Sequence, residues 1–188
     1  MTRRKLLNIA LTLAVLVAIV GLYRLTPTQK DIQEPVAVKG IVGRAVQTPR
    51  FDLTIEGVRV GKKLRIPEST PDRDSLTDFV VLDAVVSATR EPIHLASVQI
   101  RAADGTTYLG ANRNGLDQID LTGIQLSPGI PVHGSFVVEM PADKLPGAIV
   151  QVMEKAVLND LEPQATVPLG SGRPDVQDVV ALTPASDS

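Results

Sequence analysis

The chain has 188 residues, enough for one domain with extensions, and its 19 Lys and Arg against 21 Asp and Glu give a net charge of -2. Cysteine is absent, which excludes a disulfide framework, a thiolate nucleophile, a thiolate metal site and a lipid anchor built on cysteine. Without the four basic residues around the N-terminal apolar run, the chain has 15 basic and 21 acidic residues, a net charge of -6. A net negative charge repels the phosphates of nucleic acids, and only 3% of residues are aromatic, so nucleic-acid binding is not expected.

The N-terminal region predicts a membrane anchor. Residues Leu6 to Leu22 carry no charge and span roughly 25 Å as a helix, near the lower limit for crossing a bilayer. Basic residues concentrate before this run, at Arg3, Arg4 and Lys5, which places the N-terminus in the cytoplasm. We therefore predict a cytoplasmic tip and transmembrane signal-anchor helix over 1–25 and a short polar stalk over 26–35. The remainder of this single-pass protein of the cell membrane is then extracytoplasmic.

A cleaved signal peptide is the competing interpretation of the same segment, because it too begins with basic residues and an apolar run. The run here is longer than the usual stretch of about 7–15 residues. Residues 21–27 also offer no pair of small residues at cleavage-site spacing. These two features favour a retained anchor, and a cleaved, secreted domain is the alternative.

The residues from 36 to 170 predict β-strands. Phe51, Leu53 and Ile55 alternate with polar residues, as in a half-buried strand. The alternation slips after Gly57, which is typical of a β-bulge. The stretch Phe79–Ala88 is apolar on both sides until Asp83, which predicts a central strand.

Turn residues separate the later strands of this region. The pair Asp104-Gly105 follows an alternating run that begins at Val98, and it predicts a hairpin. A second alternating run, Val132–Met140, ends at Pro141. Apolar residues between Ile149 and Val157 have helical spacing, so local periodicity favours a helix there. The last segment, 171–188, lacks periodicity and is rich in Ser, Pro and Asp, so we predict a flexible tail.

From about Gln47 to Leu169 the order of these features resembles the DUF4352 group of bacterial extracytoplasmic domains, which are similar to the small secreted actinobacterial proteins of the MPT63 type. The segments that carry the resemblance are Val58–Gly61, Phe79–Pro92, Asp104–Tyr108, Leu126–Gly129 and Gly134–Pro141. Ala88-Thr89 stands where the family commonly has Asn.

The resemblance implies an all-β, immunoglobulin-like β-sandwich, preceded here by one N-terminal transmembrane helix. It favours strands at Ala148–Met153 and Ala165–Leu169 over the helix that local spacing suggests, and we adopt the strands. It carries no catalytic residue over to this chain.

Motifs for catalysis or metal binding are weak. His94 and His133 have no metal-like partner at short spacing, so both are expected at the surface. The serines at 75, 87, 97, 127 and 135 lie in no nucleophile motif, so a hydrolase is not expected. Asp72, Asp74 and Asp78 could supply oxygen ligands to calcium, but Arg73 lies among them and the EF-hand glycine and glutamate are missing. We predict a solvated loop, and neither a cofactor nor a metal.

The glycine-bounded polar segment 109–116 is the candidate contact loop, with Asn112, Arg113 and Asn114 at its centre. We therefore predict a non-enzymatic interaction or accessory module for another cell-envelope or membrane protein. The alternative is a domain that binds or senses a small molecule or lipid, and the Val, Leu and Ile content leaves acyl chains conceivable.

Overall fold

The computed structural model describes residues 12–19, 21, 36–67, 71–110, 119–154, 163–172 and 174–187. The chain divides into two compact units, Met1–Glu34 and Pro35–Ser188. In the first unit residues 12–19 are helical, and their apolar side chains are exposed. Within the described part of the chain, no helix combines the length and apolarity that crossing a membrane requires. Leu6 and Leu22, the ends of the predicted anchor, lie outside the described residues.

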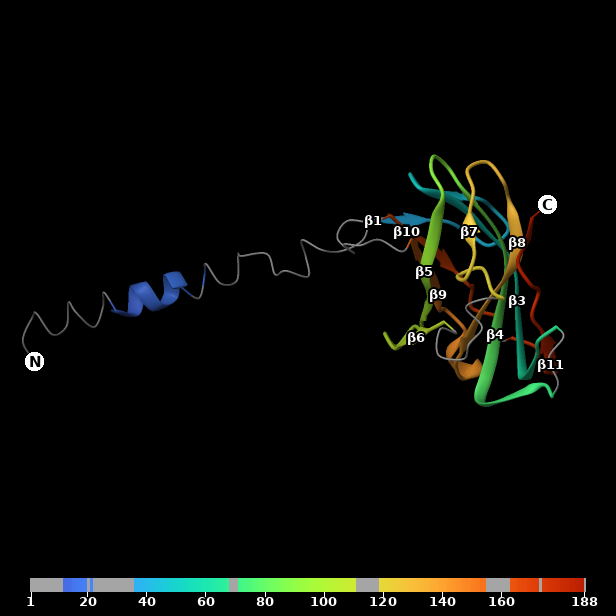
Figure 1. Cartoon of the computed structure of the whole chain (residues 1–188). Helices are drawn as coiled ribbons and strands as arrows, with labels where there is room; N and C mark the ends of the chain where they lie inside the picture. The colour runs from blue at the N-terminus through green and yellow to red at the C-terminus, as the bar shows by residue number, and fades with distance from the viewer. Residues whose placement is uncertain are drawn as a thin grey trace, which may run out of the picture. The chain divides into compact units, whose positions relative to one another are not determined.

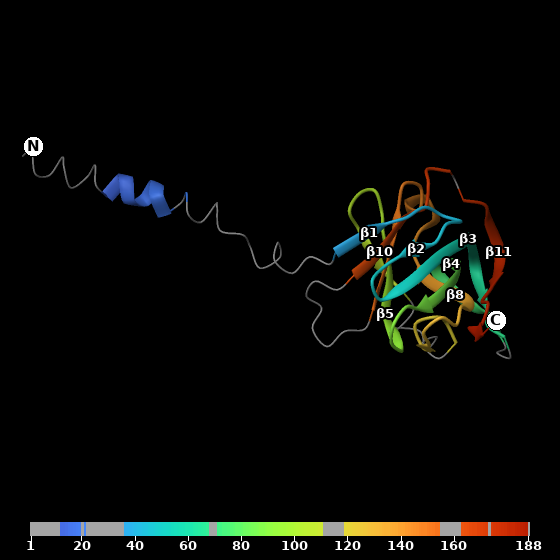
Figure 2. The ribbon, with the colours of Figure 1, turned by 90° about the horizontal axis from the view of Figure 1, so that it is seen from above.

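The second unit is a β-sandwich of two six-stranded sheets (Figures 1 and 2). Sheet A has the order β1 (Val36–Lys39), β10 (Pro163–Pro168), β9 (Ile149–Glu154), β5 (Ile93–Arg101) and β6 (Thr107–Leu109), with β7 (Gln125–Leu126) also paired to β5. Sheet B has the order β11 (Val176–Ala181), β3 (Phe51–Arg65), β4 (Arg73–Ala88), β8 (Val132–Glu139) and β12 (Ser186–Asp187), with β2 (Val46–Gln47) also paired to β3. A short 3-10 helix, η2 (Ala142–Lys144), precedes β9.

Alternating side chains of both sheets fill the space between them, as the period-two pattern predicts. Phe51, Leu53 and Ile55 of β3 are fully buried against Phe136 of β8 and their neighbours in one continuous core. The pairing of β3 with β4 shifts register between Ile55 and Gly57, which confirms the predicted bulge. The bulge reverses the side-chain phase and lets the long β3 strand keep apolar residues facing inward on both sides of it.

The hairpin predicted at Asp104-Gly105 is confirmed, since β5 and β6 pair in antiparallel fashion around it. Gly105 has φ +88°, a conformation that glycine adopts without strain. The described part of the ambiguous segment after Ala148 is a strand, β9 (Ile149–Glu154), which confirms the preference for a strand there. Its neighbours β5 and β10 supply hydrogen-bond partners on both edges, which outweighs the local helical spacing of its apolar residues.

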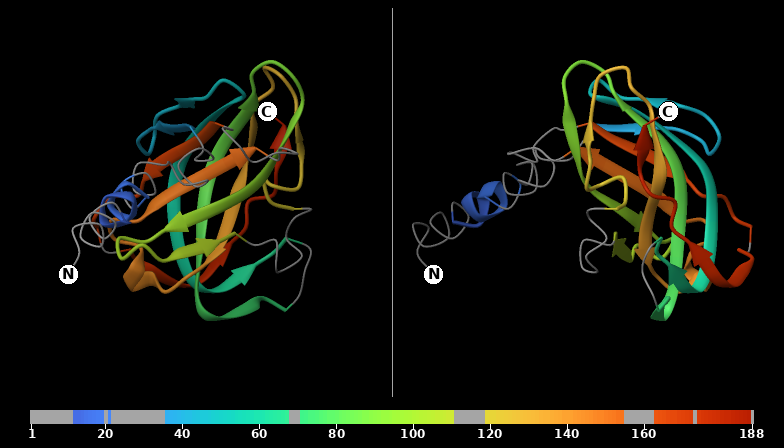
Figure 3. Two further views of the ribbon diagram at one scale, coloured as in Figure 1. Left: turned by 90° about the vertical axis from the view of Figure 1, so that its left-hand side faces the viewer. Right: turned by 45° about the vertical axis from the view of Figure 1, so that its right-hand side comes forward.

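The prediction of a flexible tail over 171–188 is wrong. Strand β11 pairs in parallel with β3, and β12 pairs in antiparallel fashion with β8, so the packed unit continues to Asp187. Figure 3 shows this segment running from the β3 side of sheet B to the β8 side. We call residues 176–187 the closing segment. Its sequence lacks periodicity because it changes its pairing partner midway, and among its described side chains only Val180 and Leu182 are buried.

Candidate functional site

A polar cluster lies on the face of sheet B that points away from the main core. Asp83 sits in the middle of β4, and Arg59 of β3 donates two hydrogen bonds to its carboxylate, at 2.7 and 2.6 Å. Ser135 of β8 lies directly opposite Asp83, and its hydroxyl donates to Asp83 Oδ1 at 2.8 Å. The Thr183 amide of the closing segment donates in turn to Ser135 Oγ at 3.2 Å. Four segments of the chain therefore meet at one carboxylate.

A hollow of about 360 Å³ lies beside this cluster, at the bulge near Gly57. Its lining comes from β3, β4, β8 and the closing segment, and it consists of Glu56, Gly57, Asp83, Ala84, His133, Gly134 and Thr183. The side chains of Glu56, His133 and Thr183 are exposed there. The hollow thus offers carboxylate, imidazole and hydroxyl groups to a polar ligand.

The serine of this site is poorly placed to act as a nucleophile. Ser135 is fully buried, its hydroxyl proton is directed at Asp83, and its oxygen accepts the Thr183 amide. Asp83 is itself held by Arg59. These hydrogen bonds suit the positioning of strands and binding more than acyl transfer. Acyl transfer needs a serine oxygen that can reach the substrate.

The aspartates considered for calcium bind basic residues of β3 instead. Lys63 Nζ lies 3.3 Å from Asp74 Oδ1, and Arg65 Nη2 lies 3.0 Å from Asp72 Oδ2. This hydrogen bond from Arg65 holds the pKa of Asp72 below its usual value. Each carboxylate has its own cation, and no group of three metal-ligating side chains occurs among the described residues.

Asp78, the third of these aspartates, is buried beside η2. Lys62 Nζ lies 2.5 Å from its Oδ1, and the Ala142 amide donates to its Oδ2 at 2.9 Å. Burial acts to raise the pKa of Asp78, but the hydrogen bonds from Lys62 and Ala142 outweigh it, and the pKa lies below its usual value. Asp78 therefore joins β3, β4 and η2 as a carboxylate.

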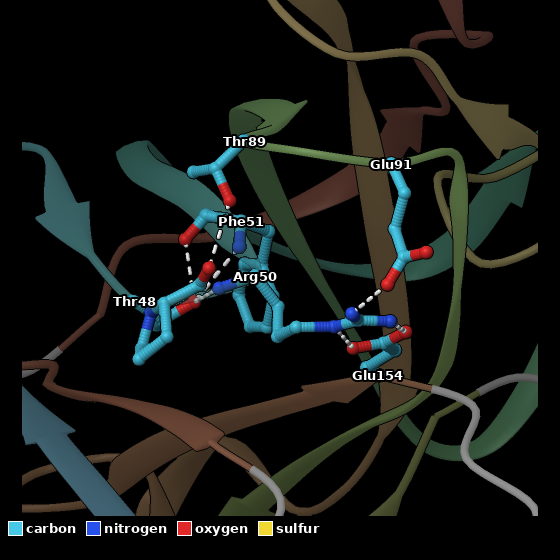
Figure 4. Close-up of polar contacts among 7 residues, drawn as sticks. Thr48, Arg50, Phe51, Thr89, Glu91 and Glu154 are labelled. Atoms are coloured by element: carbon cyan, nitrogen blue, oxygen red, sulfur yellow. Dashed lines mark hydrogen bonds and ion pairs between the residues drawn. The ribbon is translucent and has the colours of Figure 1, made fainter.

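A second ion-pair cluster links the two sheets at the turn between β2 and β3 (Figure 4). Arg50 Nε and Nη2 donate to the two Glu154 carboxylate oxygens at 2.8 and 2.7 Å, and its Nη1 contacts Glu91. The hydrogen bonds that Arg50 donates to Glu154 and Glu91 raise the pKa of Arg50. Thr48 shapes the turn, because its hydroxyl donates to the Phe51 carbonyl at 2.6 Å. Arg50 thus clamps sheet B to the end of β9 in sheet A.

The structure separates the two histidines. His94 lies on β5 opposite Gln125, whereas His133 lies on β8 and lines the hollow; both are exposed, as predicted. Asn112, Arg113 and Asn114 of the candidate contact loop lie outside the described residues. Sequence reasoning missed the pairing of Arg59 with Asp83. The signals for it were present, namely one acidic residue within an apolar strand and the phase slip at Gly57 on the strand before it.

No protein-family model matches the chain, and no curated protein matches it in sequence. Two solved structures resemble it in fold. One is an uncharacterized beta-sandwich protein from Clostridium difficile 630, with a TM-score of 0.45 and 11% identity over 77% of this chain and 99% of that one. The other is the yjhA protein from Bacillus subtilis, with a TM-score of 0.47 and 12% identity over 67% of this chain and 97% of that one. Both likenesses concern architecture alone.

Proposed function

We propose that this chain is a non-enzymatic, extracytoplasmic β-sandwich that binds another membrane or cell-envelope protein. In this proposal residues 6–22 hold it in the cell membrane with its N-terminus in the cytoplasm. The sandwich is then of the immunoglobulin-like DUF4352 type, and it uses no cofactor or metal.

The observation that carries this proposal is that the charged side chains of β3 form ion pairs within the fold. Arg59, Lys62, Lys63 and Arg65 of β3 each bind a different aspartate of β4 or the turn before it. A general acid or base needs a lone pair or proton that is free to meet a substrate. These groups instead form hydrogen bonds and ion pairs that join strands. This suits a rigid scaffold whose loops make the contacts with a partner.

The location in the membrane rests on the sequence. A basic tip followed by an uncharged apolar run of 17 residues is typical of a signal anchor. The stalk after it has about ten residues, which would keep the domain within some tens of ångströms of the bilayer. A partner at that distance from the bilayer would itself be a membrane complex or an envelope protein.

Affinity purification of the full chain from gently solubilised membranes, followed by mass spectrometry, tests the proposal. We expect a defined membrane or envelope protein in stoichiometric amount. It should be lost with Arg113→Glu in the candidate contact loop and retained with the control Arg101→Glu, a charge reversal at an exposed residue of β5. A wild-type chain that carries no partner would contradict the interaction role. A mature N-terminus beyond residue 22 would contradict the anchor.

A second candidate function is binding of a small polar molecule, and the hollow beside Asp83 favours it. Between the sheets, Phe51, Phe136 and Leu82 are fully buried in the core, so an acyl chain there would have to displace them. The hollow by contrast is open and lined by Glu56 and His133. A ligand from a metabolite library should raise the melting temperature of the wild type but not of His133→Ala, while the control His94→Ala keeps the response. A flat response across the library would exclude this candidate.

A further inference from the structure

Sheet B carries a second apolar cluster on the face away from the main core. Phe79 and Val81 of β4 and Val137 of β8 point to this face, because their neighbours in each strand point to the core. Two side chains of the closing segment, Val180 and Leu182, complete the cluster and are almost fully buried in it. This is why the central strand is apolar on both sides. The closing segment is the cover that keeps these side chains from water.

The surface under the closing segment is shaped to receive an extended chain. A Cβ on Gly61 would lie 2.8 Å from Val180 Cγ1, so this glycine makes room for the closing segment. A Cβ on Gly134 would lie 3.0 Å from the Leu121 side chain and 3.1 Å from Ala185 Cα, so that glycine makes room for both the core and the closing segment. Backbone groups of the domain also hold it. The Leu182 amide donates to the Arg65 carbonyl at 2.9 Å, and the Ser135 amide donates to the Thr183 carbonyl at 3.0 Å. This surface, on β3, β4 and β8, is a strand-acceptor site.

We propose that a second copy of this chain can fill the strand-acceptor site, so that two copies exchange their closing segments and form a closed dimer. The contacts described for the closing segment are made to parts of the domain that precede β9 in sequence. A closing segment from another copy would make the same contacts, so exchange costs little in contact energy. Because each copy both donates a closing segment and accepts one, two copies satisfy each other's strand-acceptor sites, and the assembly ends at a dimer.

Two features favour another copy over an unrelated peptide as the occupant. The site fits a parallel strand with apolar residues at the positions of Val180 and Leu182, followed by the small residue Ala185, and this chain itself supplies that pattern. Residues 169–175 connect β10 to β11 and contain Gly170, Gly172 and Pro174. Seven extended residues reach roughly 23 Å, and this is the span that the connection offers for a closing segment to leave its own domain.

In the monomer, the chain's own closing segment competes with that of a second copy for the strand-acceptor site. It acts there at an effective concentration in the millimolar range. Exchange is therefore expected where copies are crowded. The membrane anchor proposed above would crowd them, but exchange itself depends only on concentration and can be tested on the purified chain.

Single cysteines in the otherwise cysteine-free full chain test the proposal. His133 and Ser186 are exposed and lie directly opposite each other on β8 and β12. His133→Cys and Ser186→Cys chains are mixed at high concentration, partly unfolded in urea, returned to buffer and oxidised. We expect several times more disulfide between chains than with the control mixture of Gln99→Cys and Leu109→Cys. That control pair is also directly opposed, on β5 and β6, but neither residue belongs to the closing segment.

A double variant that carries both His133→Cys and Ser186→Cys in one chain, kept dilute, should form its disulfide within that chain. If it does so but the mixture gives no more disulfide between chains than the control, exchange between copies is overturned. If it does not, the placement of the closing segment on β8 is wrong and the proposal falls with it. Size-exclusion chromatography of the cross-linked mixture should give a dimer; larger species would contradict a closed exchange.

Discussion

At the scale of single residues, the clamp between the sheets depends on one buried carboxylate. Glu154 is 7% exposed, whereas Glu91, the other acceptor of Arg50, is 60% exposed. Glu154→Gln leaves one bidentate partner uncharged and should lower the free energy of unfolding by about 1–3 kcal/mol. The matched control Glu91→Gln should lower it by less than about 1 kcal/mol, since water screens that pair. Urea unfolding measures both, and equal losses would contradict the assignment of the clamp to Glu154.

A second prediction at this scale concerns acid. The hydrogen bond from Lys144, with others from Thr106, lowers the pKa of Asp104 to about 2. A carboxyl whose pKa is lower in the folded than in the unfolded chain stabilises the fold above its unfolded pKa, near 4, and loses that contribution as the pH falls. Asp104→Asn should therefore be less stable than the wild type at pH 6, and the difference should shrink between about pH 4 and pH 2. Parallel stability curves over this range would contradict the prediction.

At the scale of elements, the closing segment and β3 approach each other at a glycine. Gly61→Ala places a methyl group 2.8 Å from Val180 Cγ1 and 3.0 Å from the Val180 amide nitrogen. Overpacking of this kind costs about 1–3 kcal/mol, and the loss should fall on the closing segment. We expect faster hydrogen exchange of the Leu182 amide, which bonds to Arg65, with little change at the Val80 amide in the core of sheet B.

Gly57→Ala is the matched control on the same strand. A Cβ there meets only Asp83 Oδ2, at 3.7 Å, which is an ordinary contact. Exchange at Leu182 should stay as in the wild type. If the two alanines have the same effect on this amide, close packing of Gly61 against Val180 is not what holds the closing segment.

At the scale of the whole molecule, the predicted anchor can be tested through Leu13 and Val17. Both are exposed apolar residues of the helical stretch 12–19. Replacing both by Arg adds about 2.5–3.5 kcal/mol per residue to the cost of membrane insertion near a helix centre. The wild type should remain in the membrane pellet after an alkaline carbonate wash, and Leu13→Arg/Val17→Arg should be released. The control Leu76→Arg, at a fully exposed position in the sandwich, should stay in the pellet. Release of the wild type would contradict the anchor.

The sequence alone determined those features of this protein that depend on interactions between neighbouring residues. Alternation at Phe51, Leu53 and Ile55 predicted a strand, the phase slip at Gly57 predicted its bulge, and Asp104-Gly105 predicted a hairpin. Each of these depends on backbone conformation and side-chain direction within a few residues. The all-β architecture followed from such features repeated along the chain.

Tertiary structure alone decided the rest, because the partners are distant in sequence. Arg50 and Glu154 are 104 residues apart, and their ion pair exists only because two sheets face each other. The closing segment lacks any periodic pattern, yet it is ordered by β3 and β8, whose outward apolar side chains need a cover. A strand that is apolar on both faces indicates that something must cover it, but the fold decides which segment does so.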